Sequence, residues 1–209
     1  MTDIKFITSI VDNINVYYFE NFIDQETSDK FLDLLEDKMI YNSEEDSKVF
    51  VFGKYHKIPR KHVGYGDPGT KYKFSGTTVN AKSWNNNDDI CMYLKLFKKK
   101  VESLTNQKFN FVLINRYKDG YDSIGPHCDD EKDLGKTPNI VGLSFGTARK
   151  IVFESKQDTI LYPKSIPLVL KHGSLYIMNH PTNNYWKHSI PKDPKVKNVR
   201  ISLTFRYMI

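Results

Sequence analysis

A histidine and an aspartate stand two positions apart within residues 115–131, just after a Gly-Pro pair. His127 and Asp129 can point the same way from a short extended segment, because side chains in a strand alternate between its two faces. An imidazole and a carboxylate are two of the three protein ligands of a facial triad, which binds ferrous iron and leaves positions open for oxygen and a co-substrate. Three later histidines are candidates for the third ligand, and their spacing does not choose among them: His172, His180 and His188.

Two arginines lie on one face of the last predicted strand. Polar and apolar residues alternate strictly there, so Arg200 and Arg206 share the polar face. Because buried guanidinium groups need anionic partners, this face implies either protein carboxylates or an acidic small molecule, and a dicarboxylate would fit between two arginines. On an earlier predicted strand, Asn115 and Tyr117 also share a face and can donate hydrogen bonds to such an acid.

Two amphipathic helices precede most of the strands. The first begins after Asp24, and the second runs from about Asp88 to Ser103, where lysines 98–100 suit the negative end of a helix dipole. Residues 14–22 predict an early strand, and residues 49–53 predict either a buried strand or an exposed hydrophobic hairpin tip. Alternating apolar residues then predict six short strands: 109–117, 141–145, 150–153, 168–170, 174–178 and 199–207. This order predicts an α+β fold with a double-stranded β-helix (jelly-roll) core and N-terminal supporting helices.

Composition excludes some classes of protein. With 39% hydrophobic and 13% aromatic residues, the 209-residue chain is not disordered, and its length suits one domain. A formal net charge of +6 is compatible with a polyanionic partner without requiring one. The two cysteines, Cys91 and Cys128, form neither a disulfide framework nor a metal knuckle, which favours a reducing compartment. No stretch has the pattern of a signal peptide or a membrane span, so we expect a soluble, intracellular protein.

From Val49 to the C-terminus, the chain resembles the AlkB family of iron(II)- and 2-oxoglutarate-dependent dioxygenases. Within that family it is most similar to the branch that demethylates alkylated bases in duplex DNA. The matching segments follow the family's order: 51–54, 58–61, 65–67, 72–76, 109–120, 127–131, 173–175, 178–183 and 203–206. The resemblance implies oxidation of the N-methyl group of N1-methyladenine or N3-methylcytosine by O2, with release of formaldehyde and succinate.

The resemblance also implies roles for the residues singled out above. It makes His127, Asp129 and His188 the iron(II) ligands and catalytic centre, and leaves His172 and His180 either structural or supporting the ligands from behind. The implied 2-oxoglutarate-binding residues are Asn115, Tyr117, Arg200 and Arg206.

On the substrate side, the resemblance implies one domain, residues 1–209, in which residues 48–80 form a nucleotide-recognition and base-flipping lid. A base within a duplex must be rotated out before it can reach the iron, and an apolar side chain commonly fills the gap. Phe52 and Gly53 match the hairpin finger that does this, with Phe52 as the intercalating residue. Arg60, helped by Lys54 and Lys61, would contact the DNA phosphates, which position the protein without specifying sequence.

The flipped base is expected in a pocket with two carboxylates. Phe74 would stack on the base opposite the imidazole of His188, and the other implied lining residues are Tyr72, Asp130 and Glu131. Because N1-methyladenine and N3-methylcytosine are cationic, nearby negative charge favours them over the neutral bases.

Two departures from the duplex-acting branch leave alternatives open. Residues 154–164 lack the arginine-rich loop that holds the complementary strand, although Lys156 and Lys164 can serve there, and no clamp-binding motif is evident near the N-terminus. The alternatives to duplex DNA repair are demethylation of RNA or single-stranded DNA by the same chemistry, and a non-catalytic nucleic-acid-binding relative. We expect a monomer that binds alkylated DNA, located in the nucleus if the source is eukaryotic.

Overall fold

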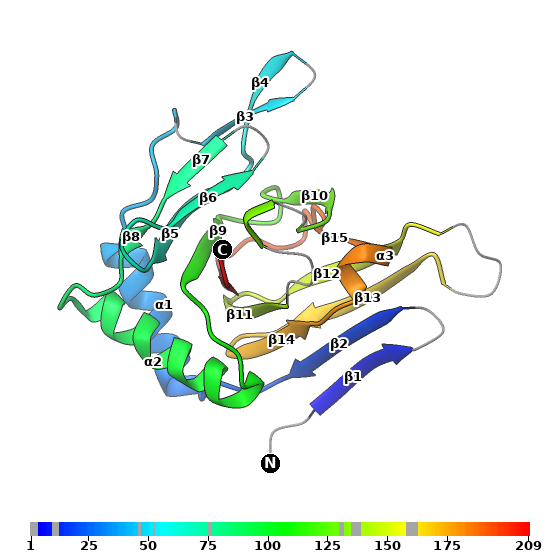
Figure 1. Cartoon of the computed structure of the whole chain (residues 1–209), viewed down its shortest axis with the longest axis horizontal. Helices are drawn as coiled ribbons and strands as arrows, with labels where there is room; N and C mark the ends of the chain where they lie inside the picture. Colours follow the sequence, from blue (N-terminus) through cyan, green and yellow to red (C-terminus); the bar gives the residue numbers. More distant parts are fainter. Residues whose placement is uncertain are drawn as a thin grey trace.

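Two β-sheets face each other across a pocket, in a computed structural model that describes residues 4–9, 13–45, 47–51, 53–74, 77–129, 132–134, 139–157 and 163–209 (Figure 1). The larger sheet contains, in spatial order, β1 (Ile4–Ser9), β2 (Ile14–Phe19), β14 (Ser174–Met178), β11 (Ile140–Gly146), β16 (Arg200–Arg206), β9 (Phe111–Tyr117), β5 (Lys61–Gly66) and β8 (Lys82–Ser83). The smaller sheet contains β10 (Ile124–His127), β15 (Trp186–Ile190), β12 (Arg149–Ser155) and β13 (Ser165–Leu170). This arrangement confirms the predicted jelly-roll core.

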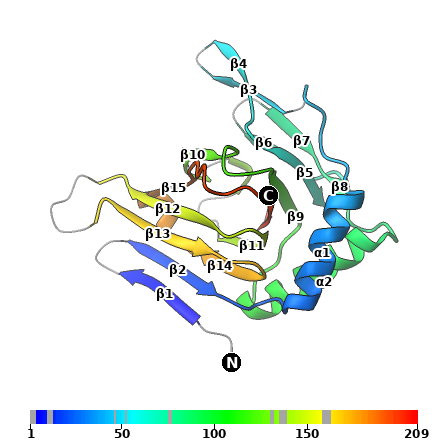
Figure 2. The ribbon, with the colours of Figure 1, turned by 180° about the vertical axis from the view of Figure 1, so that it is seen from behind.

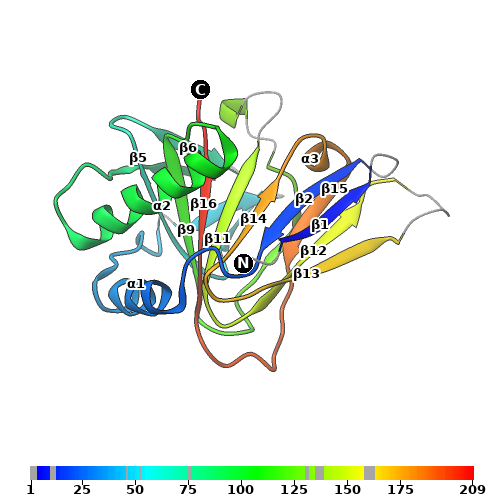
Figure 3. The same cartoon turned by 90° about the horizontal axis from the view of Figure 1, so that it is seen from below.

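The two long helices cover the outer face of the larger sheet, as Figure 3 shows from below. α1 (Gln25–Lys38) begins after Asp24, whose side chain accepts a hydrogen bond from the backbone N–H of Thr27, and α2 (Asp89–Thr105) is capped by Asp88 in the same way. Their apolar stripes bury Phe31, Leu35, Leu94, Phe97 and Val101 in one cluster with outer-face residues of β9, β11 and β16. The helices thus hold the sheet that forms one wall of the pocket.

The end of α2 corrects one prediction. The helix continues to Thr105 and stops at Asn106, which has a positive φ of 51°, so lysines 98–100 do not lie in the last turn. Lys98 instead lies over the ring of Trp84, with its Nζ atom 4.5 Å from the ring centroid. The helix dipole therefore does not explain the lysine run.

Each of the six strands predicted after α2 coincides with an observed strand, β9, β11, β12, β13, β14 or β16. The short extended segment predicted around His127 overlaps the end of β10, but no strand was predicted from Ile124, because Gly125-Pro126 is atypical of a strand. No strand was predicted at β15, which mixes charged and apolar residues, nor at β1, β5 and β8. The short α3 (Thr182–Tyr185) and a 3₁₀ turn (Lys132–Leu134) complete the described helical segments.

Two hairpins stand apart from the main sheets, beyond β5 and β8 (Figure 2). They are β3–β4 (Lys48–Val51 and Lys54–Lys57) and β6–β7 (Lys71–Phe74 and Thr77–Asn80). Of the two alternatives for residues 49–53, the structure therefore shows the hairpin, which turns at Gly53 with a positive φ of 75°. None of the described helices combines the length and apolar composition needed to cross a membrane.

We expect Phe97→Ala to lower the free energy of unfolding by about 4 kcal/mol, because it opens a cavity between the helices and the larger sheet. Phe97 is fully buried, with ring centroids 4.9 Å from Phe31 and 5.6 Å from Phe145. Urea denaturation followed by circular dichroism measures the change. Leu96→Ala is the matched control, since Leu96 precedes it on the same helix and is 43% exposed. Equal losses in both variants would contradict this account of the core.

Candidate metal and co-substrate site

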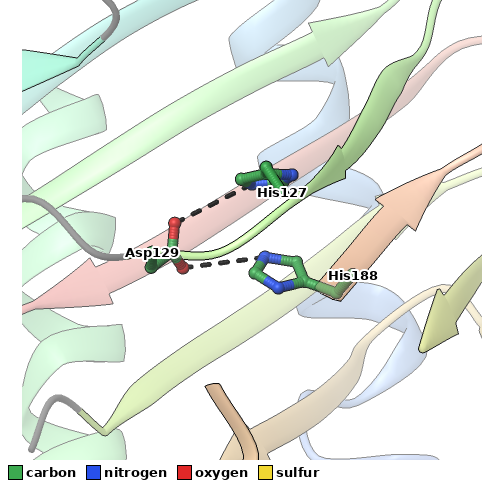
Figure 4. Close-up of side chains that lie close together, drawn as sticks. All are labelled: His127, Asp129 and His188. Atoms are coloured by element: carbon green, nitrogen blue, oxygen red, sulfur yellow. Dashed lines mark ion pairs between the residues drawn. The ribbon is translucent and has the colours of Figure 1, made fainter. Parts of the chain in front are cut away.

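Three potential metal ligands converge at one edge of the smaller sheet (Figure 4). His127 at the end of β10 pairs in register with His188 on β15, so the two imidazoles lie on neighbouring strands with ring centroids 4.2 Å apart. Asp129 follows β10 and places one carboxylate oxygen 3.8 Å from Nε2 of His127 and the other 3.7 Å from Nε2 of His188. One ligand atom from each residue lies within 4.8 Å of the other two, so the three can hold one metal ion.

The protonation states suit metal binding. Burial lowers the pKa of His188 to about 4, so its imidazole is neutral near pH 7 and has a lone pair to offer. Nδ1 of His127 lies 2.9 Å from the backbone oxygen of Gly125, which favours the proton on Nδ1 and leaves Nε2 for a metal. Burial alone would raise the pKa of Asp129, but the charge of Arg206, with smaller contributions from both histidines, lowers it to about 2. Asp129 is therefore a carboxylate.

Asn183 on α3 holds the backbone of Asp129 from the other side. Its side-chain oxygen accepts a hydrogen bond of 2.9 Å from the N–H of Asp129, and its amide donates to the carbonyl oxygen of the same residue. Both groups are buried. Asn183 thereby holds Asp129 in position through the backbone of that residue and not through its carboxylate. No role was predicted for Asn183, because no local pattern identifies an asparagine that pairs with a residue 54 positions away.

The ligands lie on a pocket of about 770 Å³ between the two sheets. All four residues predicted to bind 2-oxoglutarate line this pocket: Asn115, Tyr117, Arg200 and Arg206. They reach it from β9 and β16, which pair in a register that places Arg200 beside Tyr117 and Ser202 beside Asn115. The strand alternation used above therefore identified the correct faces.

Arg200 and Arg206 differ in their partners, and only Arg206 meets the first alternative, a protein carboxylate. Arg206 donates from Nη2 to Asp129, 2.8 Å away, and so meets a protein carboxylate. Arg200 donates from Nε to the hydroxyl of Ser144 and lies 5.2 Å from the ring centroid of Tyr117, with no ion pair to a carboxylate in the described part of the chain. Burial lowers the pKa of Arg200, and its Nη1 has no hydrogen-bond partner among the described residues. A buried cation with a spare donor in a pocket is suited to the carboxylate of a small acid.

Arg149 on β12 supports this pocket and was missed by the sequence analysis. It donates from Nη1 to the carbonyl of Asp119 (2.9 Å) and from Nη2 to the carbonyls of Asp122 (2.9 Å) and Pro191 (2.8 Å). Its guanidinium also lies 5.7 Å from the ring centroid of Tyr117. Arg149 therefore joins the loop before β10 to the end of β15, the two strands that carry the histidine ligands.

Arg60 points into the pocket. Its Nε donates to the side-chain oxygen of Asn115 (2.9 Å), and an Nη atom lies 3.3 Å from the carbonyl of Ser123. Its predicted contact with a DNA phosphate stays a prediction. Tyr72 also lines the pocket, with its ring 4.6 Å below the guanidinium carbon of Arg206, whereas Gly53 is exposed at the hairpin turn.

Several predicted substrate residues cannot be placed. Phe52, Asp130 and Glu131 lie outside the described residues, and Phe74 ends β6 with a side chain that also lies outside them. Lys156 donates to two backbone carbonyls of α3, at 3.3 and 3.0 Å, and so is tied to the helix that carries Asn183.

The other two candidate histidines lie away from the cluster. Nδ1 of His172 accepts a hydrogen bond of 2.7 Å from the N–H of Gly146, and its Nε2 lies 3.1 Å from Asp29 on α1. His180 is exposed at the start of the turn into α3. Among the described residues, only His188 joins His127 and Asp129.

We expect His188→Ala to weaken binding of Co(II), a spectroscopic substitute for iron(II), by at least about 100-fold, because it removes one of three ligands. Titration followed by the visible absorption of bound Co(II) measures this affinity. His180→Ala is the control and should bind as the wild type does. Retention of the same Co(II) spectrum and affinity in His188→Ala would contradict the three-ligand site.

We expect Arg149→Met to lower the free energy of unfolding by about 3 kcal/mol, because the backbone carbonyls of Asp119, Asp122 and Pro191 lose a charged donor. Lys150→Met, the exposed neighbour on the same strand, should leave stability nearly unchanged. Urea denaturation of both variants tests this. A loss no larger than that of the control would mean that the loop and β15 do not depend on the arginine.

Comparison with known proteins agrees with this geometry. The sequence profile of the 2OG-Fe(II) oxygenase superfamily matches residues 15–206. The chain is 43% identical over 186 residues to the human DNA oxidative demethylase ALKBH2, an alignment covering 87% of this chain and 69% of the human protein. It is equally similar to the bovine protein of that name, covering 65% of its length, and 30% identical to the one from Arabidopsis thaliana, covering 93% of this chain and 67% of that protein. The chain thus spans about two thirds of the length of these relatives.

The solved structure of OsALKBH1 has the same fold, with a TM-score of 0.61 at 13% identity, covering 98% of this chain and all of that one. The superfamily description contains the metal, the co-substrate and the reaction class expected from the sequence, so the predicted iron(II), 2-oxoglutarate and O2 dependence is confirmed at that level. The chain belongs to the 2OG-Fe(II) oxygenase superfamily and, within it, to the AlkB family of dioxygenases.

Proposed function

We propose that this protein repairs DNA by oxidative demethylation of N-alkylated bases, with N1-methyladenine and N3-methylcytosine as substrates and formaldehyde and succinate as products. The observation that carries the proposal is the cluster of His127, Asp129 and His188 at a pocket with two arginines, in a chain 43% identical to a DNA oxidative demethylase. The cluster supports an iron-dependent reaction, and the relatives' names support the substrate class.

In this proposal, His127, Asp129 and His188 hold iron(II), and Asn115, Tyr117, Arg200 and Arg206 hold 2-oxoglutarate. The metal and the oxoacid together supply the oxidation of the N-methyl group by O2. Arg206 keeps Asp129 ionised, and burial keeps the imidazole of His188 neutral, so both residues offer lone pairs at neutral pH. Arg200 neutralises the distal carboxylate of the acid in a place where water competes poorly for it.

The substrate side of the proposal concerns residues 48–80 as the base-flipping lid. Arg60 and Tyr72 already line the pocket, and Phe52, Gly53, Phe74, Asp130 and Glu131 are proposed to complete the finger and the lesion pocket. Exposed lysines on the lid strands support contact with phosphates: Lys54, Lys61, Lys71 and Lys73. A hydrophobic finger is useful only where a base stack must be filled, so we infer that duplex DNA is the preferred substrate. We also propose that the protein acts as a monomer. Such a substrate implies an intracellular location, nuclear in a eukaryote.

The test is mass spectrometry of matched oligonucleotides that carry one N1-methyladenine, in single-stranded DNA, duplex DNA and RNA, incubated with protein, Fe(II), 2-oxoglutarate and ascorbate. We expect the wild type to remove the methyl group fastest from the duplex, and Asp129→Ala to remove none because it lacks a metal ligand. Phe52→Ala should lose activity on the duplex and keep it on the single strand, since only the duplex needs a wedge.

Other outcomes separate the alternatives. Faster turnover of RNA or single-stranded DNA would replace the duplex assignment and keep the chemistry. Succinate production without loss of the methyl group would keep the dioxygenase and overturn the substrate. Binding of DNA without succinate or demethylation would indicate a non-catalytic relative.

A further inference from the structure

Tyr176 on β14 has no part in the mechanism described so far, although its side chain is buried and lines the pocket. It pairs in register with Gly142 on β11, and Gly142 pairs with Thr204 on β16. Directly opposite residues of antiparallel strands project their side chains to the same face. Tyr176 therefore shares the pocket face of the larger sheet with Thr204, from two strands away.

Gly142 allows the tyrosine to cross the strand between them. A Cβ atom added at Gly142 would lie 2.1 Å from Cε1 and 2.6 Å from Cζ of Tyr176, so the ring occupies the space that a side chain would fill there. Because Cζ carries the hydroxyl, the polar end of the ring reaches across β11 toward β16. A larger residue at position 142 would push the ring out of this place.

Tyr176, Gly142 and Thr204 form one row of paired residues across the sheet, and this row lies between Arg200 and Arg206 along β16. Thr204 is two residues from Arg206 and four from Arg200, about 7 Å and about 13 Å along the strand. Arg206 lies at the metal end of the pocket, next to Asp129, and Arg200 lies at the other end, next to Tyr117. A dicarboxylate that extends from one guanidinium to the other must pass the end of the Tyr176 ring.

The hydroxyl of Tyr176 is suited to donate to such an acid. None of the hydrogen bonds found among the described residues uses it. Burial raises the pKa of Tyr176, so the phenol keeps its proton over the physiological range. The charge of Asp129 also raises that pKa, whereas the charges of Arg200 and Arg206 lower it.

We propose that Tyr176 is a specificity-determining residue for the oxoacid co-substrate: its hydroxyl donates a hydrogen bond to the bound acid, and its ring limits the length of the chain that fits between Arg206 and Arg200. This inference rests on the proposed use of 2-oxoglutarate in the same pocket. It adds a residue from a third strand, β14, to a set that otherwise comes from β9 and β16.

The test is isothermal titration calorimetry of the full-length protein loaded with Fe(II) in the absence of oxygen. The ligands are 2-oxoglutarate and 2-oxoadipate, which is longer by one methylene group. We expect Tyr176→Phe to bind 2-oxoglutarate about ten-fold more weakly, because one hydrogen bond to a charged group is lost. Tyr176→Leu should shift the ratio of the two affinities toward 2-oxoadipate by about ten-fold, because the ring no longer fills the space that one more methylene needs.

Tyr18→Phe is the matched control. Tyr18 is a buried tyrosine that pairs with Tyr176 on the neighbouring strand β2, and its hydroxyl accepts a bond from the N–H of Lys171 outside the pocket. This variant should bind both acids as the wild type does. Wild-type affinity of Tyr176→Phe for 2-oxoglutarate, with an unchanged ratio in Tyr176→Leu, would overturn the role of Tyr176 and leave the proposed function standing. Failure of the wild type to bind either acid would overturn both.

Discussion

The arrangement of the pocket depends on the buried ion pair between Asp129 and Arg206. A carboxylate and a guanidinium placed between two sheets are each costly to bury alone, and each is tolerated because it meets the other at 2.8 Å. The pair joins the loop after β10 to β16 of the larger sheet, and so connects the two sheets at the metal end of the pocket. Removing either partner would leave the other charge without compensation, which is why the two residues must be considered as one unit.

Strand pairing and contacts between arginines and an aromatic ring position the other polar groups of the pocket. Strand pairing brings His127 and His188 to the carboxylate, and the guanidinium groups of Arg149 and Arg200 lie 5.7 and 5.2 Å from the ring centroid of Tyr117. Two positive groups close to one aromatic ring favour a fixed ring orientation, since the ring faces carry partial negative charge. Behind this polar layer, the sheet is supported by the aromatic packing of Phe31, Phe97 and Phe145, so the wall of the pocket rests on a close-packed core.

Some of this could be predicted from the sequence, and the reason for the rest is physical. Alternation with a period of two identifies the pocket face of β16 and β9, because it depends only on local geometry. Composition and capping residues predict both helices, although the true end of α2 was not seen, because an asparagine in the left-handed region is only one of several possible stops. The choice of His188 over His172 and His180 depends on the pairing of β10 with β15, which no local pattern encodes. Arg149, Asn183 and Tyr176 were missed for the same reason, since each acts through partners distant in the chain.

The hydrogen bonds between the side chain of Asn183 and the main chain of Asp129 bear on the order of folding and metal binding. The amide of Asn183 forms hydrogen bonds with the backbone of Asp129, and Arg206 neutralises the charge of Asp129. We therefore expect folding alone to position this carboxylate. Small zinc-binding domains differ, since in them the ion itself supplies the folding energy. We therefore expect folding and metal binding to be separate events in this protein, with the polypeptide folding first and acquiring the ion afterwards without rearrangement of Asp129.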